Sequence, residues 1–505
     1  MSSAAPRAKP TVICIGAGPA GLTAAYRLGK SNLPVTVFES HPAHVGGIAR
    51  TESYKGFRFD IGGHRFFSKS AEIEALWTEI LGDELLTRPR KTRILYRGKL
   101  FDYPLKPFDA LAKLGPFEAG RCMVSYGRAK LAPYRPAANF EQWVVNQFGR
   151  RLFHIFFKTY TEKVWGMACT DISADWAAQR INRLSLGRAI WHGLLPKRWR
   201  GRHGDAGMKT LIDRFRYPRL GPGQLWERTA QLVERQGGAV RLGVSVERLR
   251  RDAASGDWIV ETVDRAGKRE THRADHVIST AAIVDLAGYL DPPPPADVLR
   301  AARALRYRDF LIVALIVRER DAFDDIWLYI HEPGVKVGRI QNFKTWSPDL
   351  VPDPALNCYG MEYFCSRGDE LWEADDAALI ELARRELAEL GLARPNDILD
   401  GYVVRQPKAY PVYDEAYVRN VATFREWSAA ALPGLHLVGR NGMHKYNNQD
   451  HAMMTGLMAA ENIVAGYPKW DLWRVNQDAA YHEAGEDRSL ALETLVVPTH
   501  KTATS

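Results

Sequence analysis

Three glycines near the N-terminus, Gly16, Gly18 and Gly21, have the G-x-G-x-x-G spacing of a dinucleotide-binding site. In this pattern the first glycine allows a tight turn, the second lets the backbone approach a pyrophosphate, and the third lets a helix pack closely on a strand. Glu39 follows at roughly the 20-residue distance from which an acid accepts hydrogen bonds from a ribose. These four residues predict a dinucleotide site; the alternative is a glycine turn that binds no ligand.

The flanking segments predict the elements that would position these residues. The apolar run 12–15 is expected to be a buried parallel strand, and the motif itself opens a helix that reaches about residue 28. A second apolar strand, 35–38, ends at Glu39. The amino end of the helix would then direct amide donors and its positive dipole end at the phosphates.

A second glycine pair, Gly46 and Gly47, follows the acid, and Gly62-Gly63-His64 follows a further strand-like segment. Paired glycines let the backbone run close beside another flat portion of a ligand. Nicotinamide-binding Rossmann domains do not need this second pair, whereas flavoproteins of the two-dinucleotide type do. The sequence therefore favours FAD over NAD, with two ordinary glycine turns as the alternative.

Composition limits the class of protein. The 505 residues suffice for two or three domains, and 46% hydrophobic with 25% charged residues are typical of a soluble globular protein. No apolar run reaches the roughly 18–20 residues of a membrane span, and the first ten residues lack the apolar core of a signal peptide. Five scattered cysteines without C-x-x-C spacing argue against disulfides and a metal site. We expect a cytoplasmic protein.

The net charge of +10 favours anionic ligands such as nucleotide sugars and phosphates, but charge alone does not separate these from nucleic acid. A basic stretch, 188–203, contains Lys197, Arg198, Arg200 and Arg202. It is expected to be a solvated loop; contact with phosphate or a membrane surface is the alternative.

The predicted fold is α/β, with a Rossmann-like FAD-binding domain, an inserted helical region and a second domain built on an antiparallel sheet. A strand near Val277 would return the chain to the first domain, and prolines 292–295 mark a boundary. The expected units are a discontinuous FAD-binding domain (10–75, 224–290 and 430–470), a helical substrate or cap region (76–223), an antiparallel sheet domain (296–429) and a mobile tail (485–505).

Four motifs narrow the assignment. They are GGHRFFS from Gly62, YTEKVWG from Tyr160, the segment 176–181, and GRNG from Gly439 through Tyr446 to the Asn448–His451 stretch NQDH. Together they resemble UDP-galactopyranose mutases, especially the longer eukaryotic type, over roughly residues 10 to 465. The YTEKVWG and NQDH motifs are the most specific of the four.

This resemblance implies tightly bound FAD and interconversion of the pyranose and furanose forms of a UDP-linked sugar. The flavin acts in its reduced form, so NAD(P)H or another reductant is required. In the family, flavin N5 attacks the anomeric carbon, UDP leaves, and the sugar ring opens and recloses on the resulting adduct. No nucleic acid partner is implied, and the sequence does not indicate the oligomeric state.

The resemblance also assigns roles to individual residues. His64 would lie near flavin N5, with Gly63 beside the cofactor. Arg180 would contact both the flavin and the sugar diphosphate, and Arg339 would be the second arginine at the diphosphate. The remaining matches are Thr161 and Trp165 at the nucleotide, Tyr410 and Tyr446 as donors to the diphosphate, and Arg440, Asn448, Gln449 and Asp450 along the flavin. Surface ion pairs for the arginines and ordinary packing for the aromatic residues are the alternatives.

Two other functions share the same cofactor site. A redox enzyme of the amine oxidase or polyene desaturase type is the main alternative to the mutase, and a flavin-bearing interaction protein is the non-catalytic one. Redox dependence separates the first two, because the mutase needs reduced flavin and consumes no oxygen.

Overall fold

A parallel five-stranded sheet carries the glycine motif. The computed structural model describes residues 9–105, 107–172, 174, 214–320 and 323–476. Across the sheet the strands are β20 (Leu435–Leu437), β13 (His276–Ser279), β1 (Val12–Ile15), β2 (Val35–Glu39) and β9 (Ala239–Leu242). Each adjacent pair is parallel, so β13 does return the chain to the sheet as predicted. The α/β class is confirmed.

The central strand β1 is buried on both faces. Val12 and Cys14 face the layer formed by α1 (Pro19–Lys30), α10 (Gly223–Arg235) and α18 (Gln449–Ala465). Ile13 and Ile15 face a second layer. That layer contains β10 (Val244–Arg251), β11 (Trp258–Asp264), β12 (Arg269–Ala274), β14 (Leu290–Asp291), α11 (Ile283–Tyr289), α12 (Ala296–Arg303) and α16 (Tyr417–Ala431). Burial on both faces explains the uninterrupted apolar run.

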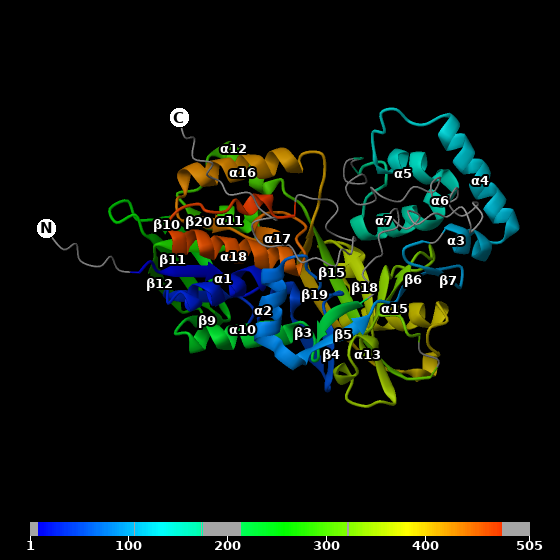
Figure 1. Cartoon of the computed structure of the whole chain (residues 1–505), viewed down its shortest axis with the longest axis horizontal. Helices are drawn as coiled ribbons and strands as arrows, with labels where there is room; N and C mark the ends of the chain where they lie inside the picture. Colours follow the sequence, from blue (N-terminus) through cyan, green and yellow to red (C-terminus); the bar gives the residue numbers. More distant parts are fainter. Residues whose placement is uncertain (1–8, 106, 173, 175–213, 321–322, 477–505) are drawn as a thin grey trace.

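A seven-stranded sheet forms the second half of the molecule (Figure 1). Its strands, in order, are β19 (Ile398–Pro411), β15 (Tyr307–Arg318), β18 (Leu356–Cys365), β17 (Arg339–Asn342), β16 (Trp327–Ile330), β6 (Thr92–Tyr96) and β7 (Lys99–Asp102). The pairs are antiparallel except for β16 and β6, which run parallel. Helix α15 (Asp376–Glu389) covers one face, and Asp375 caps its amino end.

Two expectations need correction here. The second sheet is mixed, and the segment 76–223 is not wholly helical, because it supplies β5 (Leu85–Pro89), β6, β7 and β8 (Arg214–Pro218). These strands are short, and β6 and β7 are joined by a tight turn at Arg97 and Gly98, both with positive φ. Such short alternating runs form stable strands only when a distant strand, here β16, pairs with them.

Helices form the outer end of the molecule, beside β6 and β7 (Figure 1). They are α3 (Pro107–Leu114), α4 (Pro116–Leu131), α5 (Phe140–Phe148), α6 (Arg150–Phe153) and α7 (Thr159–Trp165), which form the cap. Helix α2 (Ala71–Leu81) lies apart from the cap and packs against α10. The spacing of the aromatic residues over 140–160 predicts one continuous helix. The structure instead ends α5 at Gly149, which has a φ of +82°, and a π turn, His154–Lys158, precedes α7.

Several predicted features lie outside the described residues: Arg180 with its segment 176–181, the basic stretch 188–203, and the tail 485–505. Among the helices that the structure describes, none combines the length and the apolar character needed to cross a bilayer.

Candidate active site

The first glycine loop closes tightly around its own backbone. Gly16 has φ of +93°, and a Cβ on it would lie 2.1 Å from Thr280 Oγ1. A Cβ on Gly21 would lie 2.0 Å from the Gly16 carbonyl oxygen. A larger residue at Gly21 would therefore push α1 away from the Gly16 turn, as the motif predicts, and a larger residue at Gly16 would displace Thr280.

The second glycine pair packs against the first loop. Gly46 N–H donates to the Ala17 carbonyl at 2.8 Å. A Cβ on Gly47 would lie 3.3 Å from Gly18 Cα, and both Gly46 and Gly47 have positive φ. The two loops thus form one backbone-lined cradle beside the amino end of α1.

Glu39 ends β2 next to this cradle. Its Oε2 accepts from Ala17 N–H at 2.8 Å, and its Oε1 accepts from His41 N–H at 2.9 Å. A carboxylate has about four lone-pair sites, so capacity for ribose hydroxyls remains. The acid is held rigidly at the place where the adenosine half of a dinucleotide would lie.

A cavity of about 180 Å³ opens where the amino ends of α1 and α18 converge. Two aligned helix dipoles and their free amides favour a pyrophosphate at this point. Residues that line the cavity include Gly18, Pro19, Ala20, Gly47, Ile48, His64, Thr280, Gln406, Lys408, Ala409, Arg440, Asn441, Asn448, Gln449 and Ala452.

Gln449 provides the clearest sign that a ligand belongs in this cavity. Its side-chain Nε2 and Oε1 are both buried, and neither has a hydrogen-bond partner within the described part of the chain. The Oδ1 atom of Asn441, which also lines the cavity, is in the same condition. An unsatisfied buried amide costs about 1–3 kcal/mol, which a polar ligand recovers. The flavin ring and ribityl chain carry the donors and acceptors that fit.

Neighbouring residues of the same motif set the start of α18. Asn448 caps the helix in a reciprocal capping box with His451, so α18 begins at Gln449. Asp450 is buried and accepts from Ser68 Oγ at 3.2 Å, which ties α18 to the GGHRFFS loop. This contact places the two motifs together.

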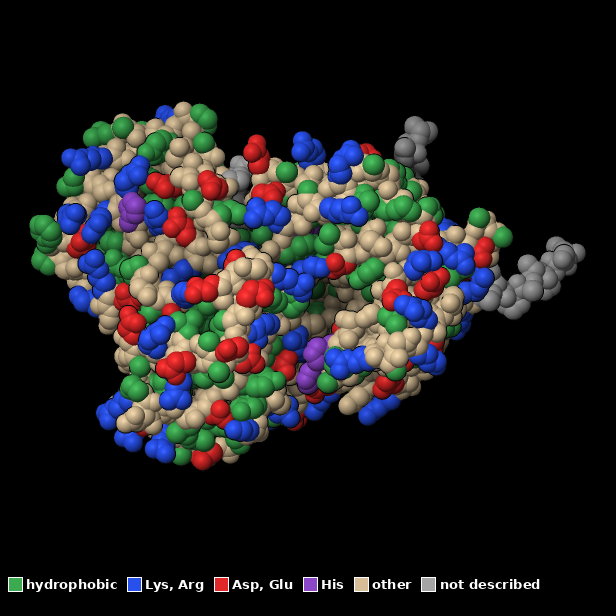
Figure 2. All heavy atoms as spheres, turned by 180° about the vertical axis from the view of Figure 1, so that it is seen from behind, with side chains coloured by type: hydrophobic (Ala, Val, Ile, Leu, Met, Phe, Trp, Pro, Cys, Tyr) green, Lys and Arg blue, Asp and Glu red, His purple; other side chains and the backbone are tan. Residues whose placement is uncertain are grey.

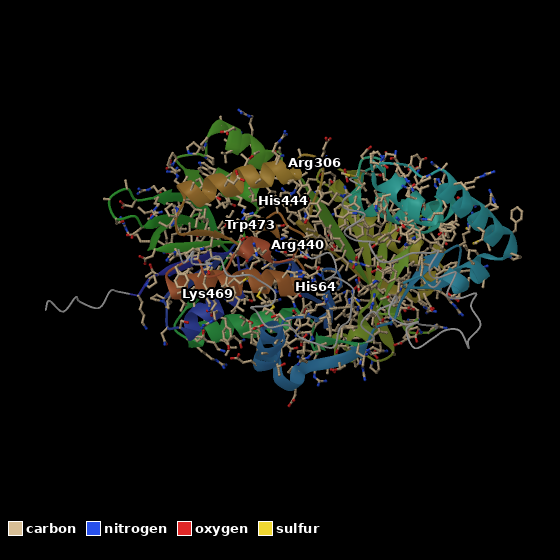
Figure 3. All side chains as sticks on the ribbon, turned by 45° about the horizontal axis from the view of Figure 1, so that its top comes forward. His64, Arg306, Arg440, His444, Lys469 and Trp473 are labelled. Carbon is tan, nitrogen blue, oxygen red and sulfur yellow. The ribbon has the colours of Figure 1, made fainter. Side chains whose placement is uncertain are left out.

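His64 lies on the cavity wall near Arg440 (Figure 3). Its Nε2 lies 3.1 Å from the Ile61 carbonyl, so this nitrogen donates. Burial, reinforced by the positive charge of Arg440, lowers the pKa of His64 to about 4. The ring is therefore neutral at physiological pH.

Three adjacent strands align a row of polar side chains beside this cavity. Tyr329 on β16 pairs in register with Arg339 on β17, and Arg339 pairs with Glu362 on β18. Arg339 Nε donates to the fully buried Glu362 carboxylate, which also accepts from Gln341 at 2.6 Å. Burial opposes the guanidinium charge, but Glu362 and the neighbouring Tyr160, Tyr410 and Tyr329 together outweigh it and raise the pKa of Arg339. Arg339 stays charged at neutral pH.

Two tyrosines and an arginine connect this row to the cavity. The rings of Tyr410 and Tyr446 are stacked with centroids 5.6 Å apart. The Arg440 guanidinium lies 4.9 Å from the Tyr446 ring centroid and donates to the carbonyls of Asn447 and Ala409. Burial, followed by the neighbouring Tyr446, raises the pKa of Tyr410, so its hydroxyl stays neutral and can donate.

Helix α7 borders the same region. The ring of Tyr160 stands perpendicular to that of Tyr329 at 5.4 Å, and Arg339 acts electrostatically on its hydroxyl. Thr161 is buried and Trp165 packs at the edge of the cap cluster. Lys163 does not face a ligand: its Nζ donates to the carbonyls of Ile330, Glu332 and Val337, which fixes α7 to the sheet.

The structure thus brings together His64, Arg339, Tyr410, Tyr446 and Arg440, and lines the cavity at the cradle with Asn448 and Gln449. Asp450 does not line the cavity: its buried carboxylate accepts from Ser68. Sequence reasoning missed four residues of this region: Glu362, Tyr160, Tyr329 and Trp327. The Cζ atoms of Arg65 and Arg339 lie 4.7 Å and 5.7 Å from the Trp327 ring centroid. Tyr160 opens the YTEKVWG motif and could have been found there. The others lie inside ordinary apolar strands, and only strand register identifies them.

Comparisons with known proteins identify the family and the fold. The family model described as flavin containing amine oxidoreductase matches residues 19–464. The chain belongs to this family, so it is a flavoenzyme of the amine oxidase superfamily. The predicted family relationship and fold are confirmed at this level.

Individual relatives include both isomerases and oxidoreductases. The chain is 23% identical over 173 residues to a probable UDP-galactopyranose mutase of Klebsiella pneumoniae, which covers 32% of this chain and 43% of that protein. It is 35% identical to coproporphyrinogen III oxidase of Mycobacterium tuberculosis over 104 residues, and this aligned segment covers 19% of this chain and 22% of that protein. Both matches span less than half of the relative.

Solved structures match over nearly the whole chain. A reduced UDP-galactopyranose mutase aligns with a TM-score of 0.77 at 22% identity, over 90% of this chain and 94% of that one. A candidate protoporphyrinogen oxidase from Exiguobacterium sp. 255-15 aligns with a TM-score of 0.66 at 16% identity, over 91% and 98%. At these identities the likeness concerns the fold.

Proposed function

We propose that this flavoenzyme interconverts the pyranose and furanose forms of a UDP-linked sugar such as UDP-galactose. The observation that carries the proposal is the group formed by Arg339, Arg440, Tyr410 and Tyr446 next to the flavin cradle. Guanidinium groups and neutral phenols are donors that suit a diphosphate, the leaving group of this reaction.

The chain's own residues would divide the work as follows. Gly18, Gly47, Glu39 and the amino ends of α1 and α18 would hold FAD, with Gln449 satisfied by its polar edge. Reduced FAD, when bound, supplies a nucleophilic nitrogen for the anomeric carbon. Arg339, kept charged by Glu362, would stabilise the departing UDP, and Tyr410 would donate to it.

Neutral His64, on the wall of the cavity, would lie beside the flavin ring. Its Nε2–H is committed to the Ile61 carbonyl, and the backbone of Ile48 also contacts the ring. A neutral imidazole beside the isoalloxazine adds no second positive charge next to Arg440. Thr161 and Trp165 would border the nucleotide, and Arg180, outside the described residues, would complete the diphosphate contacts.

The proposal is tested with purified FAD-loaded protein and UDP-galactofuranose, with and without dithionite, followed by chromatography of the sugar nucleotides. Conversion to UDP-galactopyranose only with reduced flavin is the expected result. NADPH in place of dithionite then tests whether it can serve as the reductant. No isomerisation under any reducing condition would reject the mutase.

A redox function is the second candidate, and the 35% identity to a coproporphyrinogen oxidase segment favours it. In that case oxidised flavin would accept electrons from an organic substrate and pass them to oxygen. Oxygen consumption with coproporphyrinogen III or an amine, without sugar isomerisation, would establish this alternative.

A further inference from the structure

Helix α4 presents an apolar stripe to solvent at the outer end of the molecule. Phe117, Val124 and Leu131 recur at seven-residue intervals and are 77%, 58% and 88% exposed. This spacing places all three on one face of the helix. The opposite face, with Cys122 and Ala129, is already buried in the cap cluster. The stripe is therefore not needed to seat α4 on the protein.

Basic side chains run parallel to this stripe. Arg121 and Arg128 are exposed and share the seven-residue spacing, and the Arg121 guanidinium lies 5.7 Å from the Phe117 ring centroid. Arg135, just beyond the helix, is also exposed. Figure 2, which shows the molecule from behind, has hydrophobic and basic side chains side by side along the outer edge at the left, where the cap lies.

Negative charge does not balance these arginines. Within α4 the single acid is Glu118, whose carboxylate is bound by Arg151 Nε and Nη2. Glu118 is 15% exposed, and Arg121 reaches it only at 4.0 Å. The outward face of α4 is thus apolar along its centre and positive along one flank.

We propose that α4 is an interfacial helix that binds an anionic lipid surface. An exposed apolar stripe beside arginines is the pattern of helices that lie in the headgroup region with their apolar side chains at the acyl boundary. Arg121 and Arg128 are positioned to reach lipid phosphates while Phe117, Val124 and Leu131 leave water. The inference does not depend on the proposed function.

A second copy of the chain fits this face less well. In an antiparallel pair of stripes the arginine flanks of the two helices would lie close together, and in a parallel pair each would face an uncharged flank with Gly120 and Gly127. Glu118 offsets neither arrangement, because Arg151 already binds it. Like charges at short range oppose the antiparallel contact, whereas anionic phosphates satisfy every arginine. Charge complementarity therefore selects lipid.

The test is flotation of the FAD-loaded full chain with phosphatidylglycerol-rich vesicles and with pure phosphatidylcholine vesicles. We expect binding only to the anionic vesicles, and its loss in high salt. Phe117→Ser combined with Leu131→Ser should reduce binding at least about tenfold, by removal of the buried apolar area. Arg121→Gln combined with Arg128→Gln should reduce it about thirtyfold.

Matched controls are available on other surfaces. Val418→Ser with Tyr467→Ser alters two residues that are 62% and 52% exposed elsewhere, and Arg300→Gln with Arg303→Gln removes two charges from α12. Both should bind vesicles like the parent. FAD absorbance and melting temperature should be unchanged in every variant, because all these side chains are exposed.

Three outcomes would overturn the proposal. These are no binding to anionic vesicles, equal binding by the α4 variants and their controls, or self-association without lipid that Phe117→Ser with Leu131→Ser abolishes. The last result, read by sedimentation equilibrium, would assign the stripe to a second copy instead.

Discussion

Replacing Arg339 by methionine separates its structural role from its proposed binding role. The substitution leaves the Glu362 carboxylate, which is 0% exposed, with only the Gln341 amide as a donor. Removing one partner of a buried ion pair typically costs about 3–5 kcal/mol of unfolding free energy. Because the Arg339 side chain is itself 16% exposed, we expect the lower end, about 3 kcal/mol.

A second substitution, Glu362→Gln, should rescue stability without rescuing binding. In Arg339→Met with Glu362→Gln no buried charge remains, so the unfolding free energy should return to within about 1 kcal/mol of the parent. Affinity of the reduced protein for UDP should stay about 10- to 150-fold weaker in both variants, the value of one lost charge-assisted contact. Chemical denaturation and calorimetric titration with UDP measure the two quantities.

The pH dependence provides an independent check. Burial raises the pKa of Glu362 even beside Arg339, and loss of Arg339 raises it further. The native state then binds a proton that the unfolded chain releases above about pH 4.3, so the deficit of Arg339→Met relative to the parent should shrink as pH falls.

A matched ion pair serves as the control for this experiment. Arg93 Nη2 lies 2.5 Å from the fully buried Asp325. Arg93 pairs in register with Leu328, which belongs to the cluster on the other face of the sheet. Arg93→Met should lose comparable stability and bind UDP normally. UDP affinity of the double variant equal to that of the parent would refute the binding role of Arg339.

Three further predictions concern the cradle, the helix crossing and the buried histidines. Gln449→Ala should weaken FAD binding about 3- to 10-fold in a fluorescence titration of the apoprotein, because the variant loses the hydrogen bonds that the amide would make to the cofactor. The amide makes no hydrogen bond within the described part of the chain, so its loss should not destabilise the protein. Unchanged affinity would remove Gln449 from the flavin site. Gly456→Ala should lower the unfolding free energy by about 1–3 kcal/mol, because the new Cβ would lie 2.1 Å from the Ala20 carbonyl oxygen. Gly288→Ala, which has open space around it, is the control and should leave stability unchanged. Equal melting temperatures of the two variants would contradict the close crossing of α1 and α18. Burial lowers the pKa of His331 to about 3 and that of His444 to about 4, whereas a histidine of the unfolded chain has a pKa of about 6.5. The unfolded state therefore binds more protons as the pH falls, and each histidine should lower the unfolding free energy by about 2 kcal/mol between pH 7 and 5. His331→Gln and His444→Gln should each reduce this pH dependence in denaturation curves, and an unchanged dependence would contradict the buried, neutral state of the ring.

Local patterns were sufficient for the cofactor half of the molecule. Gly16, Gly21 and Glu39 act within one short strand–turn–helix–strand unit, and their spacing follows from the geometry of that unit. The same holds for Asn448 and His451, whose capping box involves residues three apart. Such contacts depend on neighbours along the chain, so a single sequence displays them.

Other features could not be predicted from local patterns. Strands β6 and β7 lie in a segment expected to be helical, because β6 becomes a strand only through pairing with β16, more than 200 residues away. Glu362 looks like any residue of an apolar strand until register places it opposite Arg339. The aromatic residues of 140–160 recur at helical spacing, yet Gly149, with positive φ, ends α5 there and divides the segment into separate helices.

The sequence by itself therefore determined the dinucleotide cradle and the family. It also indicated arginines and tyrosines that could meet a diphosphate. Only the tertiary structure decided which of them lie together and which acid keeps Arg339 charged. It also showed that the buried Gln449 amide has no hydrogen-bond partner within the described part of the chain. The physical reason is that backbone turns and caps are set by residues a few positions apart, whereas register between distant strands and burial exist only after the chain has folded.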